Sequence, residues 1–360
     1  MMALSRALAI GLLVTFVAHT KVLGQAHVQW TVSRVPELAG TQLHGPYGIS
    51  RGPGKALYIC DCDAQLVRKL SSDGKVSIIA GNGTRGYSGD GGPATSAQLS
   101  DPYEVRFDHA GDIYFVEMKN NVVRKVDHAT GVISTIAGTG KPGFAGDGGP
   151  ASKAQLNQPH SIQFDAHGDL YICDIANSRI RKIDMKTGVI NTFAGTGKKE
   201  PTPEGSPRAG TALNGPRAID FDRAGNLWLA LREGNAVYKL DIATDTWRRI
   251  AGTGAKGFTG NGGPALQATL SGPKGLSIGP DGNVYLTDTE SHSIRMIDVK
   301  AGTIDVVAGD NKIGNATGLG LQSRFKRPHG IFVDADGAIF VGDTENDRVC
   351  AIRPGSGQVK

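Results

Sequence analysis

A segment that occurs twice in close copy decides the fold of this chain. The two copies are LSDPYEVRFDHAGDIYFVEMKNNVVRKVDHATGVISTIAGTG (residues 99–140) and LNQPHSIQFDAHGDLYICDIANSRIRKIDMKTGVINTFAGTG (residues 156–197). Four further copies start at Leu43, Leu213, Leu270 and Phe325. A proline marks every copy, and successive prolines are 55 to 57 residues apart: Pro46, Pro102, Pro159, Pro216, Pro273 and Pro328. A fixed period of this length indicates a repeat architecture.

Each copy predicts four short strands separated by turns rich in Gly, Asp and Asn. In the copy at 156–197 they run through HSIQFD, DLYICD, RIRKID and VINTFAG. Four-stranded sheets repeated at this period bury both of their faces when they pack radially around a channel. We therefore expect an all-β, six-bladed β-propeller with repeats near residues 43–98, 99–155, 156–212, 213–269, 270–324 and 325–354.

The last copy indicates how the ring closes. It has room for only three strands before the chain ends at Lys360, whereas residues 30–35 (WTVSRV) followed by Leu38-Ala39-Gly40 match the outer-strand pattern of the other copies. We expect residues 28–40 to supply the missing outer strand of the sixth blade. An open solenoid is the alternative, but it would leave two unpaired sheet edges that the sequence does not protect.

The composition agrees with this fold and excludes some partners. The 360 residues include 51 Gly and 17 Pro, which disfavour long helices, and the 39% hydrophobic content is enough for a large core. The formal net charge is only +5, without the dense basic face that duplex DNA requires. Nucleic acid is therefore not an expected partner, and we expect a monomer.

The first 24 residues have the layout of a cleaved secretory signal. Arg6 precedes an apolar run at 7–18, and small residues flank the predicted cut before Gln25. The run is shorter than the roughly 20 residues that span a bilayer. We expect a single propeller domain at 25–360, secreted or periplasmic, with no integral membrane segment after cleavage.

Export permits disulfides, and the chain has four cysteines. Cys60 and Cys173 occupy the same place in two repeats, which favours small buried hydrophobic residues inside a sheet. A bridge from Cys350 to Cys60 or Cys62 is the alternative, because it would join the first and last repeats. A metal site at Cys60 and Cys62 is the least favoured interpretation.

The repeat unit resembles the NHL repeat. Residues 171–180 (YICDIANSRI) are similar to that family's core of a strand, an Asp and Asn-x-Arg-Ile, and the similarity covers about residues 43–354. The loop GYSGDGGPA (86–94), with copies at 143–151 and 257–265, is like loops of secreted bacterial NHL propellers. This resemblance implies the propeller fold, but the family is diverse in function.

Candidate site residues follow each repeat proline, where the innermost strand begins at the channel mouth. The long loops between blades should reach the same face, where insertions tend to serve binding. The acids at the end of the second strand recur in five copies, which favours a structural role, and Leu231 followed by Arg232 breaks that pattern. The six residues after the prolines are all large, polar or titratable and differ from one another: Tyr47, Tyr103, His160, Arg217, Lys274 and His329.

Two of these residues suggest a metal. His160 and His329 lie in opposite blades, and His44 is a candidate third ligand. QPHSI and RPHGI resemble the zinc-binding histidine segments of peptidylglycine amidating lyases, which implies zinc beside a catalytic tyrosine and an arginine. Arg232 matches the arginine's context, but the tyrosine does not carry over. Calcium on the Gly-Asp-Gly-Gly-Pro loops is less favoured, because Asp90 and Asp147 supply one acid per loop.

Two functions therefore remain open. In the first, an exported propeller binds a peptide, a glycan or a small anionic molecule at the channel mouth, with Arg217, Lys274 and Arg232 as the cationic groups. In the second, a metal-dependent lyase or hydrolase holds a cation on the histidines and uses Tyr47 or Tyr103 as acid or base with Arg232 orienting the substrate. The cofactor stays unknown, and the sequence does not decide whether the protein is an enzyme.

Overall fold

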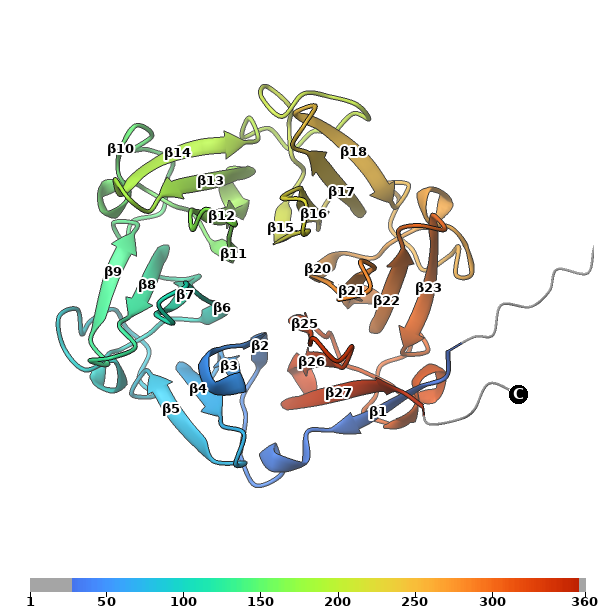
Figure 1. Ribbon diagram of the computed structural model, residues 1–360, viewed down its shortest axis with the longest axis horizontal. Helices are drawn as coiled ribbons and strands as arrows, with labels where there is room; N and C mark the ends of the chain where they lie inside the picture. The colour runs from blue at the N-terminus through green and yellow to red at the C-terminus, as the bar shows by residue number, and fades with distance from the viewer. Residues whose placement is uncertain (1–27, 356–360) are drawn as a thin grey trace, which may run out of the picture.

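Six antiparallel sheets surround a common axis in the computed structural model, which describes residues 28–355 (Figure 1). Blades 1 to 3 are built from β2 (Pro46–Arg51), β3 (Leu57–Asp61), β4 (Leu66–Leu70) and β5 (Val76–Ala80); β6 (Pro102–Phe107), β7 (Ile113–Glu117), β8 (Val122–Val126) and β9 (Ile133–Ala137); and β11 (Pro159–Phe164), β12 (Leu170–Asp174), β13 (Arg179–Asp184) and β14 (Val189–Ala194). Each blade runs outward from the axis in chain order. The predicted six-bladed propeller is confirmed.

Blades 4 to 6 repeat the same order. They contain β15 (Pro216–Phe221), β16 (Leu227–Leu231), β17 (Ala236–Asp241) and β18 (Thr246–Ala251); β20 (Pro273–Ile278), β21 (Val284–Asp288), β22 (Ser293–Asp298) and β23 (Thr303–Ala308); and β25 (Ile331–Val333), β26 (Ile339–Asp343), β27 (Arg348–Pro354) and β1 (Trp30–Arg34). The proposed leader, residues 1–24, lies outside the described residues. Within residues 28–355 no helix is long and apolar enough to cross a membrane.

The N-terminal strand closes the ring as predicted. β1 pairs antiparallel with β27, in a register that runs from Trp30 opposite Pro354 to Arg34 opposite Cys350. On its other side β1 pairs with β24 (Gly318–Leu319), so it is an internal strand of its sheet. The blue β1 therefore lies beside the red β27 in Figure 1. The first and last described strands thus belong to one blade, which leaves no open solenoid edge there.

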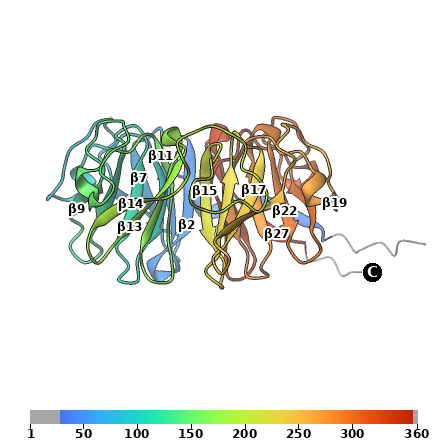
Figure 2. The same cartoon turned by 90° about the horizontal axis from the view of Figure 1, so that it is seen from above.

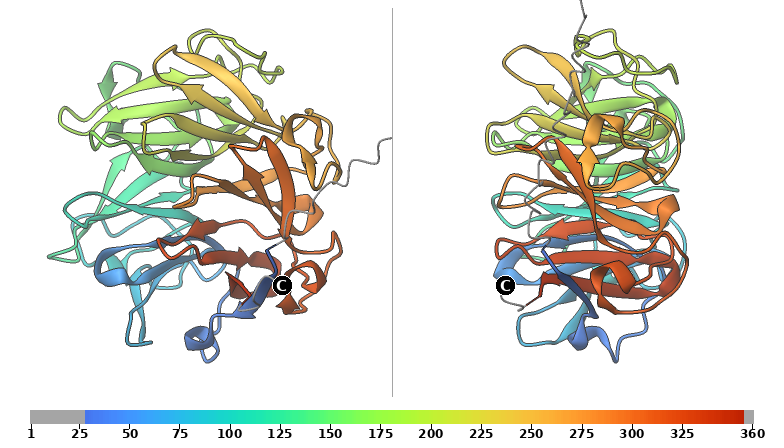
Figure 3. Two further views of the ribbon diagram at one scale, coloured as in Figure 1. Left: turned by 45° about the vertical axis from the view of Figure 1, so that its right-hand side comes forward. Right: turned by 90° about the vertical axis from the view of Figure 1, so that its right-hand side faces the viewer.

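The hydrophobic core is divided into six clusters, each wedged between two adjacent blades. Tyr58 of β3 and Phe115 of β7 meet in one such cluster, and Val35 meets Ile59 and Phe340 in the cluster that seals blade 6 against blade 1. Seen from the rim, the blades span the full thickness of the disc (Figures 2 and 3). Each blade is thus stabilised by its neighbours on both faces rather than by a single central core.

The long loops between blades reach the face on which the second strands end, where Asn120 and Asn177 donate to the Gly86 and Gly143 carbonyls. Their Gly-Gly-Pro tips run along the outer strand of the following blade. β10 (Gly149–Pro150) pairs with β14 and β19 (Gly263–Pro264) pairs with β23, and Pro93 forms a bridge to Val132 beside β9. The loops therefore cover outer sheet edges that would otherwise be open to pairing with another chain.

Short 3-10 turns make the remaining regular structure. η2 (Pro53–Lys55) lies between the first and second strands of blade 1. The others mark the inter-blade loops and the turn between the second and third strands of a blade: η1 (Pro36–Leu38), η3 (Ala94–Ser96), η4 (Ala151–Lys153), η5 (Ile175–Asn177), η6 (Ala265–Gln267), η7 (Thr289–Ser291), η8 (Gly320–Gln322) and η9 (Thr344–Asn346). All four cysteines are free and buried, three of them inside strands. The interpretation as small buried residues is therefore confirmed, and the alternative bridge from Cys350 is wrong.

Candidate functional site

The residue before each repeat proline turns the chain toward the axis. All six of these residues have positive φ, including the non-glycine residues Asp101 (54°), Gln158 (51°) and Arg327 (48°). Non-glycine residues adopt this region at a cost, and they do so where the surroundings hold them. Here hydrogen bonds from the neighbouring blade stabilise the conformation. Asn121 Oδ1 accepts from the Gln158 N–H at 2.8 Å, and Asp347 Oδ1 accepts from the Gly45 N–H at 2.8 Å across the closure.

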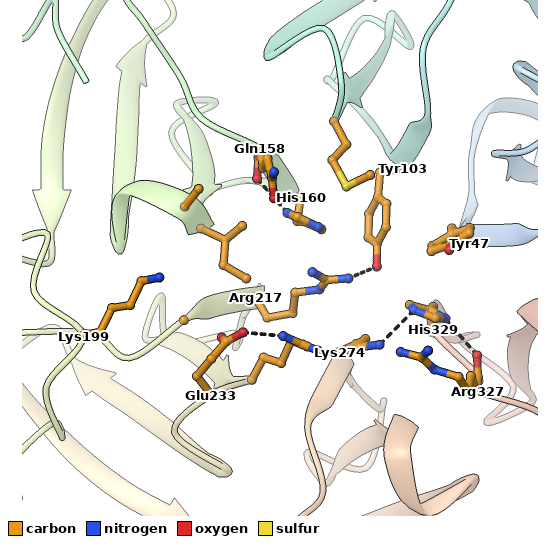
Figure 4. A pocket seen from close by; sticks show the side chains of 15 residues that line it. Tyr47, Tyr103, Gln158, His160, Lys199, Arg217, Glu233, Lys274, Arg327 and His329 are labelled. Carbon is orange, nitrogen blue, oxygen red and sulfur yellow. Dashed lines mark hydrogen bonds and ion pairs between the residues drawn. The ribbon is translucent and has the colours of Figure 1, made fainter. Parts of the chain in front are cut away.

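These turns place the following six side chains around one cavity of about 400 Å³ at the channel mouth (Figure 4). Its lining includes all the residues that follow the repeat prolines: Tyr47, Tyr103, His160, Arg217, Lys274 and His329. Arg232 also lines it, from the turn after β16. The volume lies at the small end of the range for ligand pockets. Side chains separated by more than two hundred residues in sequence are therefore neighbours here.

Aromatic rings form one wall of this cavity. The ring centroids of Tyr47 and Tyr103 are 4.7 Å apart, those of Tyr47 and His329 are 4.4 Å apart, and those of Tyr103 and His160 are 4.6 Å apart. Burial raises the pKa of the Tyr103 hydroxyl to about 12, so this phenol is protonated at neutral pH. The wall offers a flat apolar surface with hydroxyl and imidazole groups at its edges.

Both cavity histidines are held in the neutral form. His160 Nδ1–H donates to the Gln158 carbonyl at 2.7 Å, and His329 Nδ1–H donates to the Arg327 carbonyl at 2.8 Å. Burial, followed by nearby Arg and Lys charges, lowers the pKa of both rings well below the usual range. The Nε2 atoms are thus acceptors, and that of His329 already faces the Lys274 ammonium at 3.2 Å.

The predicted metal ligands are only partly brought together. His160 and His329 share the cavity, but the His44 side chain is exposed and outside it, because the chain reverses at Gly45. Within residues 28–355 no group of three or more His, Cys, Asp or Glu is placed to hold a metal ion. His44 instead contributes its backbone N–H, which donates to Asp61 Oδ1 at 2.6 Å.

Arg217 is the most unusual group in the cavity. It is 7% exposed, and its guanidinium donates to the Tyr103 hydroxyl and lies 4.9 Å from the centre of that ring. Its Nε is buried without a hydrogen-bond partner, and no ion pair joins it to any described residue. Glu104 interacts with Arg217 electrostatically but does not pair with it. A buried charge without an ion-pair partner is costly, and such a cost is expected at a site that an anion completes.

Sequence reasoning missed an acidic group beside Lys274. Glu290, in η7, presents its Oε1 to Lys274 Nζ at 3.1 Å and to Arg327 Nη2 at 2.9 Å. Glu290, Glu233 and Glu345 occupy the same place in three successive blades, two residues beyond the end of the second strand. Comparing that place across copies would have found them. Glu233 is the only acid among the described residues that line the cavity. Five basic residues line it as well: Lys199, Arg217, Arg232, Lys274 and Arg327.

The strand-end acids are structural, as their recurrence favours. Glu117 accepts from the Ser100 N–H at 2.7 Å and from Arg124 at 2.6 Å, with both ion-pair side chains fully buried. The same arginine holds Asp90 of the Gly-Asp-Gly-Gly-Pro loop at 2.8 Å, so this Asp is engaged without calcium. The equivalent pairs in other blades are Asp61 with Arg68, Asp174 with Arg181, Asp288 with Arg295 and Asp343 with Arg348.

In blade 4 both members of this acid–arginine pair are replaced by other residues. Leu231 stands for the acid, and Tyr238, seven residues later, stands for the arginine. Both are buried in the cluster between blades 3 and 4, and the Tyr238 hydroxyl donates to the Thr202 carbonyl at 2.6 Å. The break at Leu231 is thus a structural substitution. Arg232, however, does line the cavity, where it pairs with Glu233.

Below the cavity the channel narrows to a void of about 20 Å³. Glu104 lies here between the inner strands of blades 2 and 3, paired with Arg106 and hydrogen-bonded to Ser161. Burial raises the pKa of the Glu104 carboxyl to about 7, against the opposing effect of Arg106. The cavity therefore ends at a polar floor.

Comparison with known proteins identifies the family. The SMP-30/gluconolactonase/LRE-like region matches residues 104–360, which is more than half of the chain. The chain belongs to the SMP-30/gluconolactonase/LRE-like family. The resemblance to NHL repeats is confirmed as well, because human NHL repeat-containing protein 2 is 25% identical over 288 residues, which cover 70% of this chain and 38% of that protein.

This family member is also similar to two other proteins. It is 28% identical over 235 residues to the chloroplastic protein SUPPRESSOR OF QUENCHING 1 of Arabidopsis thaliana, covering 62% of this chain and 22% of that one. A solved auxiliary nutrient binding protein from Bacteroides thetaiotaomicron has a TM-score of 0.64 at 18% identity, covering 87% and 69% of the two chains. The chain spans less than two fifths of the length of these curated relatives, and the structural match establishes the fold alone.

Proposed function

We propose that this family member is an exported propeller that binds a small ligand bearing a carboxylate or phosphate group in the cavity at the channel mouth. The single observation that carries the proposal is Arg217, a buried guanidinium without an acidic partner among the described residues. A planar anion can accept two parallel N–H bonds from such a group. The description of a solved propeller of this fold as a nutrient binding protein supports a binding role in general terms.

The cavity also restricts the ligand. About 400 Å³ accommodates a small molecule or the end of a larger chain, rather than a whole peptide or glycan. The tyrosine rings can pack against a planar or apolar part of the ligand, and the basic residues opposite them can pair with its anionic group. Export rests on the sequence of residues 1–24. Of the predicted metal ligands, His160 and His329 share the cavity and His44 lies outside it.

The first prediction separates binding from folding. The Arg217→Met variant should bind succinate or inorganic phosphate about 30-fold to 100-fold more weakly, since a charge-assisted pair is lost. The ligand-free variant should be as stable as the parent protein or more stable by about 1 kcal/mol, because the unpaired buried charge is gone. Isothermal titration and urea unfolding measure the two quantities.

The matched control is Arg232→Met. This arginine lines the same cavity but is more exposed and already paired with Glu233. It should weaken binding by less than about tenfold, since exposed pairs contribute little. Unchanged affinity in the Arg217→Met variant, or no binding of either anion by the parent protein, would overturn the proposed function. The two probes also distinguish a carboxylate site from a phosphate site.

A second prediction concerns pH. Burial and the Arg217 charge lower the pKa of Lys274 to about 7, with Glu290 acting in the opposite direction. Because Lys274 is charged below this pKa and neutral above it, succinate should bind about tenfold more weakly at pH 8.5 than at pH 6. The Lys274→Arg variant keeps its charge and should show little change over this range. A parent protein whose affinity is equally flat would contradict the assignment.

A further inference from the structure

Lys274 differs from every other basic group of the cavity because an imidazole faces its amine. Its side chain is 3% exposed, and Nζ lies 3.2 Å from His329 Nε2 and 3.1 Å from Glu290 Oε1. His329 is fixed as the Nε2 acceptor by the bond from its Nδ1–H to the Arg327 carbonyl. The amine therefore has a proton acceptor in direct contact and is itself shielded from bulk water.

The surrounding charges disfavour the ammonium form of this lysine. The Glu290 Oε1 atom that Lys274 contacts is shared with Arg327 at 2.9 Å and with Arg232 at 3.9 Å. The single Glu290 carboxylate thus interacts with three cationic side chains, and Arg217 is a fourth positive charge that acts on Lys274. A desolvated lysine beside other cations is the arrangement that makes an amine nucleophilic near neutral pH.

We propose that Lys274 captures the carbonyl carbon of a small 2-oxo acid as a reversible Schiff base, with the acid's carboxylate held by Arg217. This inference rests on the proposed function and names the ligand class for the same cavity. A carboxylate adjacent to a ketone or aldehyde satisfies both features at once, because one end pairs with a guanidinium and the other accepts the amine.

The chemistry balances within the cavity. The Nζ lone pair attacks the carbonyl carbon, and one amine proton passes through His329 Nε2 to the carbonyl oxygen, which gives a carbinolamine. The second N–H proton passes by the same route to the carbinolamine hydroxyl, which leaves as water while the C=N bond forms. One water is lost overall, and nothing is oxidised or reduced. His329 touches the reacting nitrogen, so it is the proton carrier of both steps.

The test traps the adduct by reduction. The protein is incubated with pyruvate or glyoxylate and sodium cyanoborohydride, which reduces C=N to a stable secondary amine, and the modified lysine is located by peptide mass mapping. Lys199 is the internal control, since it lines the same cavity but is exposed. An ordinary lysine with a pKa near 10.4 is almost wholly protonated at pH 7 and then has no lone pair with which to attack. Lys274 should therefore be modified at least about tenfold more than Lys199.

The pH profile is a second readout. Trapping at Lys274 should increase from pH 6 to pH 8, opposite to the binding of succinate. The charged and titratable groups that face Lys274 are Arg217, Arg232, Glu290, Arg327 and His329. The lowered pKa of Glu290 keeps that carboxylate charged over this range, and burial keeps His329 neutral. Glu104 at the bottom of the cavity also titrates near pH 7, so the profile is measured on a Glu104→Gln variant as well, in which the same increase reports Lys274.

Variants distinguish the two proposals. Lys274→Arg keeps the charge but not the nucleophile, and Lys274→Met keeps neither, so both variants should lose the adduct at residue 274. The succinate affinity of the parent protein measures the anion site separately. Pyruvate and succinate that both bind, with Lys274 modified no more than Lys199, would overturn the Schiff base and leave the anion site intact. A parent protein that binds neither compound would overturn the proposed function itself.

Discussion

A protein that lacks residues 28–40 is expected to be mostly insoluble. The deletion removes β1, which is internal to its sheet, and so exposes the whole edge of β27 and separates β24 from its partner. Val32, Val35 and Leu38 also leave the core, each 6% exposed or less. Burying such side chains contributes about 1.5–3 kcal/mol apiece, and their sum approaches the 5–15 kcal/mol that stabilises a typical folded domain.

The measurement is the soluble fraction after expression, followed by the thermal midpoint of whatever remains soluble. A synthetic peptide of residues 28–40 added during refolding should restore solubility, because it can occupy the vacant place between β27 and β24. A scrambled peptide of the same composition should not. A truncated protein that stays soluble with an unchanged midpoint would mean that β1 does not close the ring.

The second large effect is expected at a buried ion pair. Arg124→Leu should lower the free energy of unfolding by about 3–5 kcal/mol, because Glu117 stays fully buried and loses the arginine that favours its charged form. The same change releases Asp90 and the Ser88 carbonyl, which Arg124 holds at 2.8 and 3.1 Å. Urea unfolding measures the loss, and limited proteolysis should cut the loop at 86–94 faster.

Blade 4 provides the matched rescue for that variant. Glu117→Leu combined with Arg124→Tyr copies the Leu231 and Tyr238 pair, and it should recover about half of the lost stability since no buried charge remains. Arg353→Leu removes an exposed pair with Asp336 and should cost less than about 1 kcal/mol. Equal losses in the Arg124 and Arg353 variants would show that burial is not the cause.

Much of the site was predictable because the repeats align the chain with itself. The six residues after the prolines share one structural position, so a closed ring brings them together whatever their chemistry. The acidic partners were missed, although Glu233, Glu290 and Glu345 also share a position. Their importance lies in contacts with Arg327 and Lys274 from neighbouring segments, and a comparison within one repeat does not reveal contacts between repeats.

The loops gave the opposite lesson. Their length suggested a binding face, but their Gly-Gly-Pro tips pair with outer strands, as Gly149 does with Ile190. A loop sequence indicates where the chain leaves a sheet, but it does not indicate which strand the loop then pairs with. His292 is a similar case: as a turn residue it gave no sign of an inter-blade role, yet its Nδ1 accepts the Arg327 N–H at 3.1 Å.

The amino-acid sequence by itself determined the number of blades, their strand order and the strand that closes the ring. These features depend on local patterns, namely prolines, turn glycines and alternating apolar residues, which act over a few positions and recur along the chain. Only the tertiary structure decided the chemistry of the hub. Whether Arg217 is unpaired or Lys274 is poised as an amine depends on burial and on charges from distant repeats, because electrostatic free energies follow distance in space and access to water.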